Sequence, residues 1–288
     1  MTESWLKLSV QAKASQLDAI ANFLIERGSP GVVMKQRGVE ASFIRLCSDD
    51  VLRRDVEEFL ADISKLSTNG ARPIARWSVI GATNWQNSWK RFIKPRRIGK
   101  RFWVTPPWLK PPNFRRREVI TIEPGMAFGT GTHATTRSCL EYLERVAEIF
   151  GTRRFTALDV GTGAGILAIA LVKLGARQVW AIDNDPIALE VARQNIAAND
   201  ALKRVRLSGK GLNELRGRFP LVVANLTAET LLGLAPVLER RVSARGFLIL
   251  SGILHTQSSA IVQRFADRFN VASRRRRQEW ITLLLQRK

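Results

Sequence analysis

The sequence predicts an α/β protein of two domains, and two patterns support this prediction. Residues 156–185 combine a buried strand, a glycine-rich turn, an apolar helix and a second buried strand. Such a unit is typical of a parallel sheet that binds a nucleoside where its strands end. Residues 4–79 alternate between strand and helix patterns in the order β-α-β-β-α-β of ferredoxin-like domains. We therefore expect a small ferredoxin-like α+β domain followed by a Rossmann-like domain.

The N-terminal domain is expected to occupy residues 1–80. Its first helix has Ser15 in the position of an N-cap and Gly28 as the residue that ends it. A tight turn at Arg37–Gly38 separates its two middle strands. No pattern in this domain points to catalysis, so we interpret it as a recognition or docking domain. Its expected strands and helices lie at residues 4–12, 15–28, 30–38, 40–47, 49–66 and 72–80.

Residues 81–117 are expected to form a basic linker rich in tryptophan and proline. Five of the eight tryptophans lie between Trp77 and Trp108, and eleven lysines and arginines but no acidic residue lie between Trp89 and Arg117. These side chains could stack on exposed bases, or they could pack a seam between the domains while their charged ends stay in water. We favour the seam because the segment joins two domains.

The turn after the first buried strand carries the candidate ligand site. Its pattern D-x-G-x-G-x-G is formed by Asp159, Gly161, Gly163 and Gly165. Glycine lets the backbone approach a ligand closely, and the helix start offers free N–H groups. Asp183 ends the next strand, where a carboxylate accepts hydrogen bonds from ribose hydroxyls. A dinucleotide fingerprint would have glycine in place of Ile166, so the pattern resembles instead the S-adenosylmethionine site of class I methyltransferases.

A second glycine-rich loop, residues 123–136, precedes the cofactor strand and is expected to cover the nucleoside as a lid. Phe128 is placed to cover an apolar face of the ligand, and a helix should begin near Thr135 or Thr136. For His133 we favour a hydrogen bond that anchors the loop over acid–base chemistry.

The remainder of the second domain, residues 118–288, continues the alternation of strands and helices. Strand Leu221–Ala224 delivers Asn225 to the carboxyl edge of the sheet, where open α/β sheets bind ligands. The run Arg274–Arg277 is expected to form a solvated turn or the start of a strand. The other expected elements lie at residues 186–199, 205–209, 246–254, 256–269 and 280–285.

Composition narrows the classes of partner. The formal net charge of +21 indicates an anionic partner, most often nucleic acid, or else an arginine-rich solvated surface without one. Cys47, Cys139, His133 and His255 are too few and too scattered for a disulfide framework or a metal site. The sequence shows neither the apolar region of a secretory signal nor an apolar run long enough to span a membrane. We therefore expect a cytoplasmic protein with reduced cysteines and no membrane partner.

Several stretches together resemble one known family, the methyltransferases that modify ribosomal protein L11 of the bacterial large subunit. The resemblance implies a ferredoxin-like domain that recognises the substrate, a mobile linker and a class I domain that uses S-adenosyl-L-methionine. It also implies methylation of lysine ε-amines and of the N-terminal α-amine of L11. The matching stretches are NWQNSWKRFIKPRRIGKRFWVTPPW, EPGMAFGTGTHATT, LDVGTGAGILAIALVKLGA, AIDNDPIALEVARQN, VVANLTAETLLGLAP and QEWITLLLQRK.

The resemblance also implies a set of cofactor contacts, namely Thr136, Gly161, Asp183 and Asn225, with Asp159 and Gly163 in support. The chain departs from the family pattern at Ala134, where proline is usual, and at Thr227, where an aliphatic residue is usual. The first change should loosen the lid, and the second could alter which amines are accepted. We expect the protein to be a monomer. Its excess positive charge is explained if it binds L11 on the ribosome, in contact with ribosomal RNA.

Asn225 is the expected catalytic residue, because methyl transfer is an in-line displacement that needs a positioned neutral amine. Its side chain would accept a hydrogen bond from the amine and aim the lone pair at the methyl group. The charge also favours an S-adenosylmethionine-dependent RNA methyltransferase, although N-L-T-A stands where nucleobase amino-methyltransferases carry N-P-P and an aromatic residue. A non-catalytic RNA-binding protein is the remaining alternative.

Overall fold

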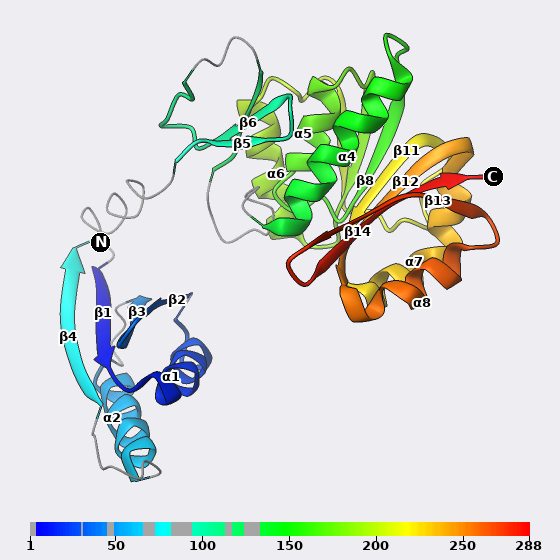
Figure 1. The fold of residues 1–288 in the computed structure, drawn as a ribbon. Coiled ribbons are helices and arrows are strands. Elements are labelled where there is room, and N and C mark those ends of the chain that lie inside the picture. The colour runs from blue at the N-terminus through cyan, green and yellow to red at the C-terminus, as the bar shows by residue number, and fades with distance from the viewer. Residues whose placement is uncertain are drawn as a thin grey trace. The chain divides into compact units, whose positions relative to one another are not determined.

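The structure is a computed structural model that describes residues 4–29, 31–44, 49–65, 73–81, 94–112, 117–123 and 133–288. The chain divides into two compact units, Met1–Ile93 and Lys94–Lys288 (Figure 1). The first unit has one sheet and one buried core, and the second has a large sheet with a buried core on each face and a small additional sheet.

The N-terminal unit has the predicted ferredoxin-like order of strands and helices. Its four strands pair antiparallel in the order β2-β3-β1-β4. Alternate residues of the first strand, Leu6, Leu8 and Val10, are buried beneath Ile20 and Leu24 of the first helix. The elements are β1 (Ser4–Gln11), α1 (Ala14–Glu26), β2 (Val32–Lys35), β3 (Gly38–Ile44), α2 (Asp49–Lys65) and β4 (Ile74–Gly81).

Helix α1 begins earlier than its predicted cap. The N-cap is Lys13, whose backbone N–H donates to Oε1 of Gln16 at 3.1 Å. Because the Gln16 side chain satisfies this end of the helix, no hydroxyl is needed at the cap. The prediction that Ser15 caps the helix was therefore wrong. Gly28, with φ of 93°, follows the last turn as predicted.

The second unit begins inside the segment predicted as a linker. Strands β5 (Arg96–Ile98), β6 (Phe102–Thr105) and β7 (Glu118–Thr121) form a small sheet in that order. Ile98 and Phe102 are buried in the main core of the second unit. The predicted linker end at residue 117 was therefore wrong, because apolar side chains of this segment complete that core.

One tryptophan of this segment, Trp103, has a structural role. Trp103 is only 6% exposed, and the guanidinium of Arg97 lies 5.0 Å from the centroid of its ring. Its ring is therefore available neither to a base nor to a seam between domains. Residues 82–93, which include Trp85 and Trp89, lie outside the described residues.

The large sheet of the second unit has the order β10-β9-β8-β11-β12-β14-β13. The strands from β10 to β12 are parallel, and β14 runs antiparallel to both of its neighbours. The order reverses between β8 and β11, and open α/β sheets bind ligands at the carboxyl ends of the strands on either side of such a switch point. The strands are β8 (Thr156–Val160), β9 (Gln178–Ile182), β10 (Val205–Ser208), β11 (Phe219–Asn225), β12 (Val242–Leu254), β13 (Phe269–Arg277) and β14 (Trp280–Arg287).

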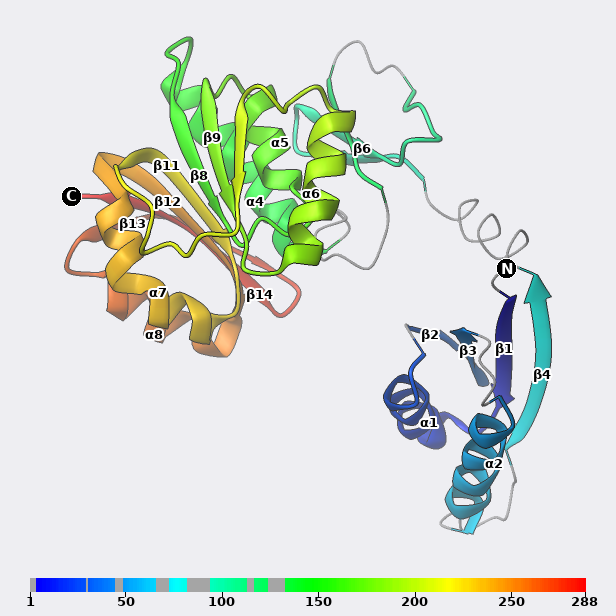
Figure 2. The same cartoon turned by 180° about the vertical axis from the view of Figure 1, so that it is seen from behind.

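Helices cover both faces of this sheet (Figures 1 and 2). On one side lie α4 (Ala134–Phe150), α5 (Ile166–Lys173) and α6 (Pro186–Ala198). On the other lie α7 (Ala228–Arg241) and α8 (Ser258–Phe265). The central strands are apolar on both faces, as buried parallel strands require. None of the described helices has the length and apolar character needed to cross a lipid bilayer.

Two C-terminal predictions need correction. The helix expected at residues 256–269 is shorter, a single 3₁₀ turn (His255–Gln257) followed by α8. The run Arg274–Arg277, predicted as a solvated turn or the start of a strand, is in a strand but forms the end of edge strand β13, and two of its arginines form ion pairs.

Candidate cofactor and substrate site

The glycine turn between β8 and α5 has a left-handed backbone. Gly161, Gly163 and Gly165 have φ of 71°, 53° and 84°, a region that residues with side chains avoid. The N–H groups of Gly161 and Thr162 both donate to the carbonyl oxygen of Ile182, at 2.9 and 3.0 Å. The turn is therefore attached to the end of β9 and faces the crevice beside β11.

Asp183 closes the same turn from the β9 side. Its Oδ2 accepts from the N–H of Gly163 at 2.8 Å, and its Oδ1 accepts from the N–H of Asp185 at 3.1 Å. The residue is only partly buried, and each carboxylate oxygen keeps a second lone pair. The two backbone bonds orient the carboxylate at the sheet edge, a position compatible with the predicted ribose contact.

Asp159 lies beneath the turn and is completely buried. Its Oδ2 accepts from the hydroxyl of Thr162 at 2.7 Å, while Oδ1 has no hydrogen-bond partner among the described residues. Burial raises the pKa of this carboxyl to about 7, and the negative charge of Asp183 contributes to this rise. The hydrogen bonds from Thr162 and the Ala168 amide act in the opposite direction and lower the pKa. Since neither oxygen is exposed, the role of Asp159 is to stabilise the turn through its hydrogen bond with Thr162.

This buried carboxyl leads to a specific pH dependence of stability. Its pKa of about 7 in the folded protein is above the value of about 3.9 for aspartate in an unfolded chain, so folding favours the protonated form. The contribution of Asp159 to stability is therefore complete below pH of about 4 and is lost as the pH rises through about 7.

Replacement Asp159→Asn removes this titration. Relative to the unsubstituted protein, the variant should gain free energy of unfolding between pH of about 4 and about 8, by an amount on the order of 2–4 kcal/mol. Urea denaturation at several pH values measures this difference. A difference that stays constant across the range would contradict the assignment, whatever its absolute size.

The first turns of α4 place buried polar groups next to the same edge of the sheet. The hydroxyl oxygen of Thr136, in the first turn, is buried and has no hydrogen-bond partner among the described residues. One turn later, burial raises the pKa of the Cys139 thiol to about 12, opposed by a hydrogen bond with Ser251 of β12 and assisted by the charge of Asp159. Thr136 therefore offers an orphaned hydroxyl of the kind that a bound ligand satisfies.

His133 is the N-cap of α4. Its Nδ1 accepts from the N–H of Thr135 at 3.4 Å, and its ring packs edge-on against Trp280 with 5.2 Å between centroids. These contacts agree with the anchoring role that the sequence favoured, although the helix begins at Ala134 rather than at Thr135 or Thr136. Phe128 and the other residues from 124 to 132 of the predicted lid lie outside the described residues, so their roles stay predictions.

Leu226, the residue after Asn225, lies between two glycines, with its side chain next to Gly161 and its backbone next to Gly252. Asn225 ends β11, and the N–H of Leu226 donates to the carbonyl of Ser251 at 3.1 Å. A Cβ on Gly161 would lie 3.2 Å from Leu226 Cγ and still closer to Cδ2. A Cβ on Gly252 would lie 2.8 Å from the Leu226 carbonyl carbon. We call Leu226 with Gly161 and Gly252 the Leu226 clamp, and it packs the residue that directly follows Asn225 against both glycines.

The sequence reading missed this clamp, although one signal for it was present. Gly252 interrupts an otherwise apolar strand pattern, which often marks a bulge or a close backbone approach. The pairing of β12 with β14 does shift between Leu250 and Ile253, and Gly252 has φ of 82°.

Thr227, one of the two departures from the family pattern, has a local structural role. It is the N-cap of α7, where its hydroxyl accepts from the N–H of Thr230 at 3.4 Å and lies 2.8 Å from the Thr230 hydroxyl. A hydroxyl at this position satisfies the helix end, which an aliphatic side chain cannot do.

The sheet order, the glycine turn and the polar residues at the switch point define an α/β enzyme of the class I methyltransferase type. The chain belongs to the ribosomal protein L11 methyltransferase (PrmA) family, whose model matches residues 4–288. The resemblance identified from the sequence is thereby confirmed.

Individual relatives match over almost the whole chain. It is 37% identical to the ribosomal protein L11 methyltransferase of Pelobacter propionicus, over 100% of this chain and 99% of that protein. It is 33% identical to that of Geotalea uraniireducens, over 98% of each. The crystal structure of a ribosomal protein L11 methylase from Lactobacillus delbrueckii subsp. bulgaricus is 35% identical, with a TM-score of 0.61, and covers 68% of this chain and 100% of its own.

Proposed function

We propose that this protein transfers methyl groups from S-adenosyl-L-methionine to lysine ε-amines and/or the N-terminal α-amine of ribosomal protein L11. The observation that carries the proposal is the bonded turn of Gly163 and Asp183 at the switch point, in a chain that matches the family over residues 4–288. A ribosomal substrate would place the reaction in the cytoplasm.

The residues present suit this cofactor, which when bound supplies an activated methyl group on a cationic sulfur. Asp183 would hold the ribose, and Thr136 would use its orphaned hydroxyl on the ligand. The Gly161–Gly163 turn, supported by Asp159, would shape the site for the methionine end. Phe128 would cover an apolar face of the bound molecule.

Asn225 would position the nucleophile. An amine attacks only when it is neutral, and free lysine has a pKa of about 10.4. Burial next to a cation lowers this pKa and disfavours the ammonium form. The side-chain carbonyl of Asn225 would accept a hydrogen bond from the neutral amine and direct its lone pair. A water molecule would remove the proton.

The N-terminal unit would recognise L11, as its lack of a catalytic pattern suggests. The net charge of +21 supports engagement of L11 on the ribosome, next to ribosomal RNA. We propose that the enzyme acts as a monomer.

Intact-mass spectrometry tests the reaction directly. The purified protein is incubated with S-adenosyl-L-methionine and ribosomal protein L11, and naked ribosomal RNA is the parallel substrate. L11 should gain mass in steps of about 14 Da, one for each methyl group. Peptide mapping then places the methyl groups on lysine side chains or on the N-terminus.

A reaction without the cofactor is the control and should leave both masses unchanged. Mass gained on RNA alone would overturn the proposal in favour of the RNA methyltransferase. Cofactor binding without any mass gain on either substrate would instead support a non-catalytic RNA-binding protein.

A further inference from the structure

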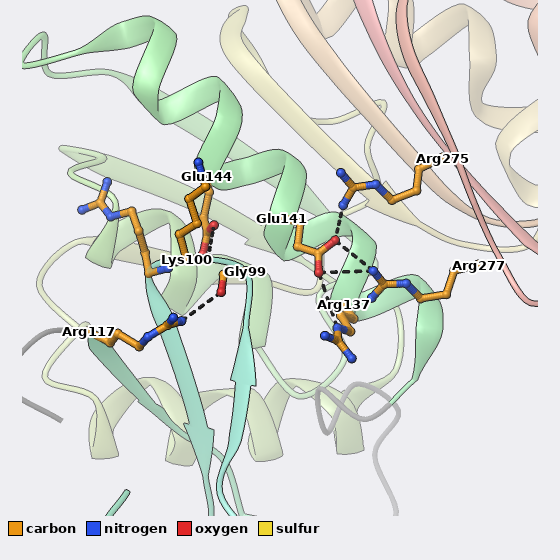
Figure 3. A network of polar contacts seen from close by, with 9 residues as sticks. Gly99, Lys100, Arg117, Arg137, Glu141, Glu144, Arg275 and Arg277 are labelled. Atoms are coloured by element: carbon orange, nitrogen blue, oxygen red, sulfur yellow. Dashed lines mark hydrogen bonds and ion pairs between the residues drawn. The ribbon is translucent and has the colours of Figure 1, made fainter. Parts of the chain in front are cut away.

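A group of arginines next to α4 converges on a single carboxylate. Arg137 of α4 and Arg275 and Arg277 of β13 all point at Glu141 (Figure 3). Arg277 Nη2 donates to both Glu141 oxygens, at 3.1 and 3.3 Å, and Arg275 Nη1 donates to one of them. Each guanidinium has five N–H donors, far more in total than one carboxylate accepts. Three guanidinium groups on one carboxylate leave a surplus of two positive charges.

The surplus donors are held in place and can reach a ligand. The side chains of Arg137, Arg275 and Arg277 are 50%, 40% and 30% exposed. The exposed N–H groups of these side chains are the ones that can reach a ligand, whereas Nη1 of Arg277 is buried. The guanidinium of Arg275 lies 5.1 Å from the centroid of the buried Tyr142 ring. Because these groups are already ordered, a ligand would bind them at a smaller entropic cost.

Three residues further along α4, a second carboxylate is occupied by backbone groups. Glu144 is buried and accepts from the backbone N–H groups of Lys100 and Arg101, at 2.8 Å each. Arg117 Nη1 donates to the carbonyl of Gly99 at 2.9 Å. Glu141 and Glu144 are three residues apart and are neighbours on the surface of α4, with Lys100 and Arg117 beyond one and Arg275 and Arg277 beyond the other (Figure 3). The cationic side chains here are therefore not paired with Glu144.

These two groups form a surface that we call the α4 basic face, and we propose that it binds the phosphodiester backbone of RNA. Guanidinium groups match phosphate oxygens with paired hydrogen bonds. Several cations on one surface suit a linear polyanion, whose binding releases its counterions. The face consists of Arg137, Arg275, Arg277, Lys100 and Arg117.

This inference rests on the proposed function, since an enzyme that modifies a ribosomal protein works next to ribosomal RNA. An alternative role for these arginines is to protect the edge of the sheet, but this role explains fewer of the basic residues. Charges on edge strand β13 would deter pairing with another sheet. Lys100, however, lies on the turn between β5 and β6, outside that sheet, and Arg137 is part of α4 and not of the edge strand.

The test measures the affinity of the full-length protein for a short fluorescent RNA hairpin by anisotropy, at several salt concentrations. The triple variant Arg137→Gln, Arg275→Gln, Arg277→Gln should bind about tenfold more weakly near physiological salt. The slope of log affinity against log salt should fall by about 2 to 3, one for each lost phosphate contact. Circular dichroism and thermal unfolding verify that the variant is folded.

A matched variant removes the same charge from exposed arginines elsewhere on this unit, Arg216→Gln, Arg218→Gln and Arg240→Gln. It should lose much less affinity, and an equal loss would show that net charge alone drives binding and overturn the site. Glu141→Gln should act in the opposite direction and tighten RNA binding about two- to threefold, because it removes the only carboxylate among three arginines. Weakened binding in this variant would also overturn the site.

Polyglutamate serves as a second probe. If it competes as well as RNA and responds to the same arginines, the face binds acidic protein and the RNA assignment fails. Methylation of free L11, measured in parallel, separates the two proposals. Normal methylation without RNA binding rejects only this inference, and RNA binding without methylation rejects only the proposed function.

Discussion

Replacement Asn225→Ala should lower kcat for methylation of L11 about 100-fold at saturating cofactor, because the variant can no longer orient the incoming amine. The affinity for L11 should change far less, since most of the substrate is recognised elsewhere. Asn225 is only partly buried at the end of β11, so the melting temperature should stay nearly unchanged. Single-turnover kinetics with preloaded cofactor measures the chemical step without interference from product release.

The control for this variant is Asn270→Ala, which removes the same side chain from an exposed position of edge strand β13. Its kcat should equal that of the unsubstituted protein. A full kcat in Asn225→Ala would refute the catalytic assignment. A large loss of cofactor affinity with an intact chemical step would make Asn225 a cofactor ligand only.

Replacement Gly252→Ala should be nearly as damaging, although Gly252 touches no reacting group. Its φ of 82° is unfavourable for alanine, and the new methyl group would meet the carbonyl and nitrogen of Leu226, 2.8 Å from the carbon and 3.2 Å from the nitrogen. Because these neighbours are backbone, the chain after Asn225 must move. We expect kcat to fall roughly 10- to 100-fold, since small displacements at a reaction centre are costly, while cofactor affinity changes less.

Gly175→Ala is the matched control for Gly252→Ala. Gly175 also has positive φ, 98°, but a Cβ there would meet nothing within 4 Å. It should therefore lose stability of about 1 kcal/mol from backbone strain without losing kcat. If Gly252→Ala lowered stability but left kcat intact, the Leu226 clamp would have no role in positioning Asn225.

Much of the fold follows from patterns that the sequence displays directly. Period-two apolar strands, the D-x-G-x-G-x-G turn and the β-α-β-β-α-β order were enough to predict both sheets. The structure brings Gly161, Gly163 and Asp183 into one bonded arrangement at the crevice. Their contacts with the cofactor, like that of Thr136, remain predictions.

The corrections share a physical cause, which is that tertiary contacts override local signals. The β5–β6 segment has prolines, tryptophans and charges that are typical of a linker. It is nevertheless part of the second unit, because Glu144 accepts hydrogen bonds from its backbone and its apolar side chains are buried in the core. Glu141 draws Arg275 and Arg277 into an ordered strand, although four consecutive arginines usually indicate a solvated turn. The Leu226 clamp joins residues far apart in the chain, and only the folded structure reveals such proximity.

Helix α4 belongs to both proposed sites, and this has a thermodynamic consequence. Its first turn carries Thr136, and its middle carries Glu141 and Glu144. If this helix of 17 residues shifts as one body when phosphate binds to its basic face, a cofactor bound at its first turn is affected as well. By reciprocity, the factor by which RNA changes the affinity for cofactor equals the factor by which cofactor changes the affinity for RNA. Contact with the ribosome would then control how tightly the enzyme binds its methyl-donating cofactor.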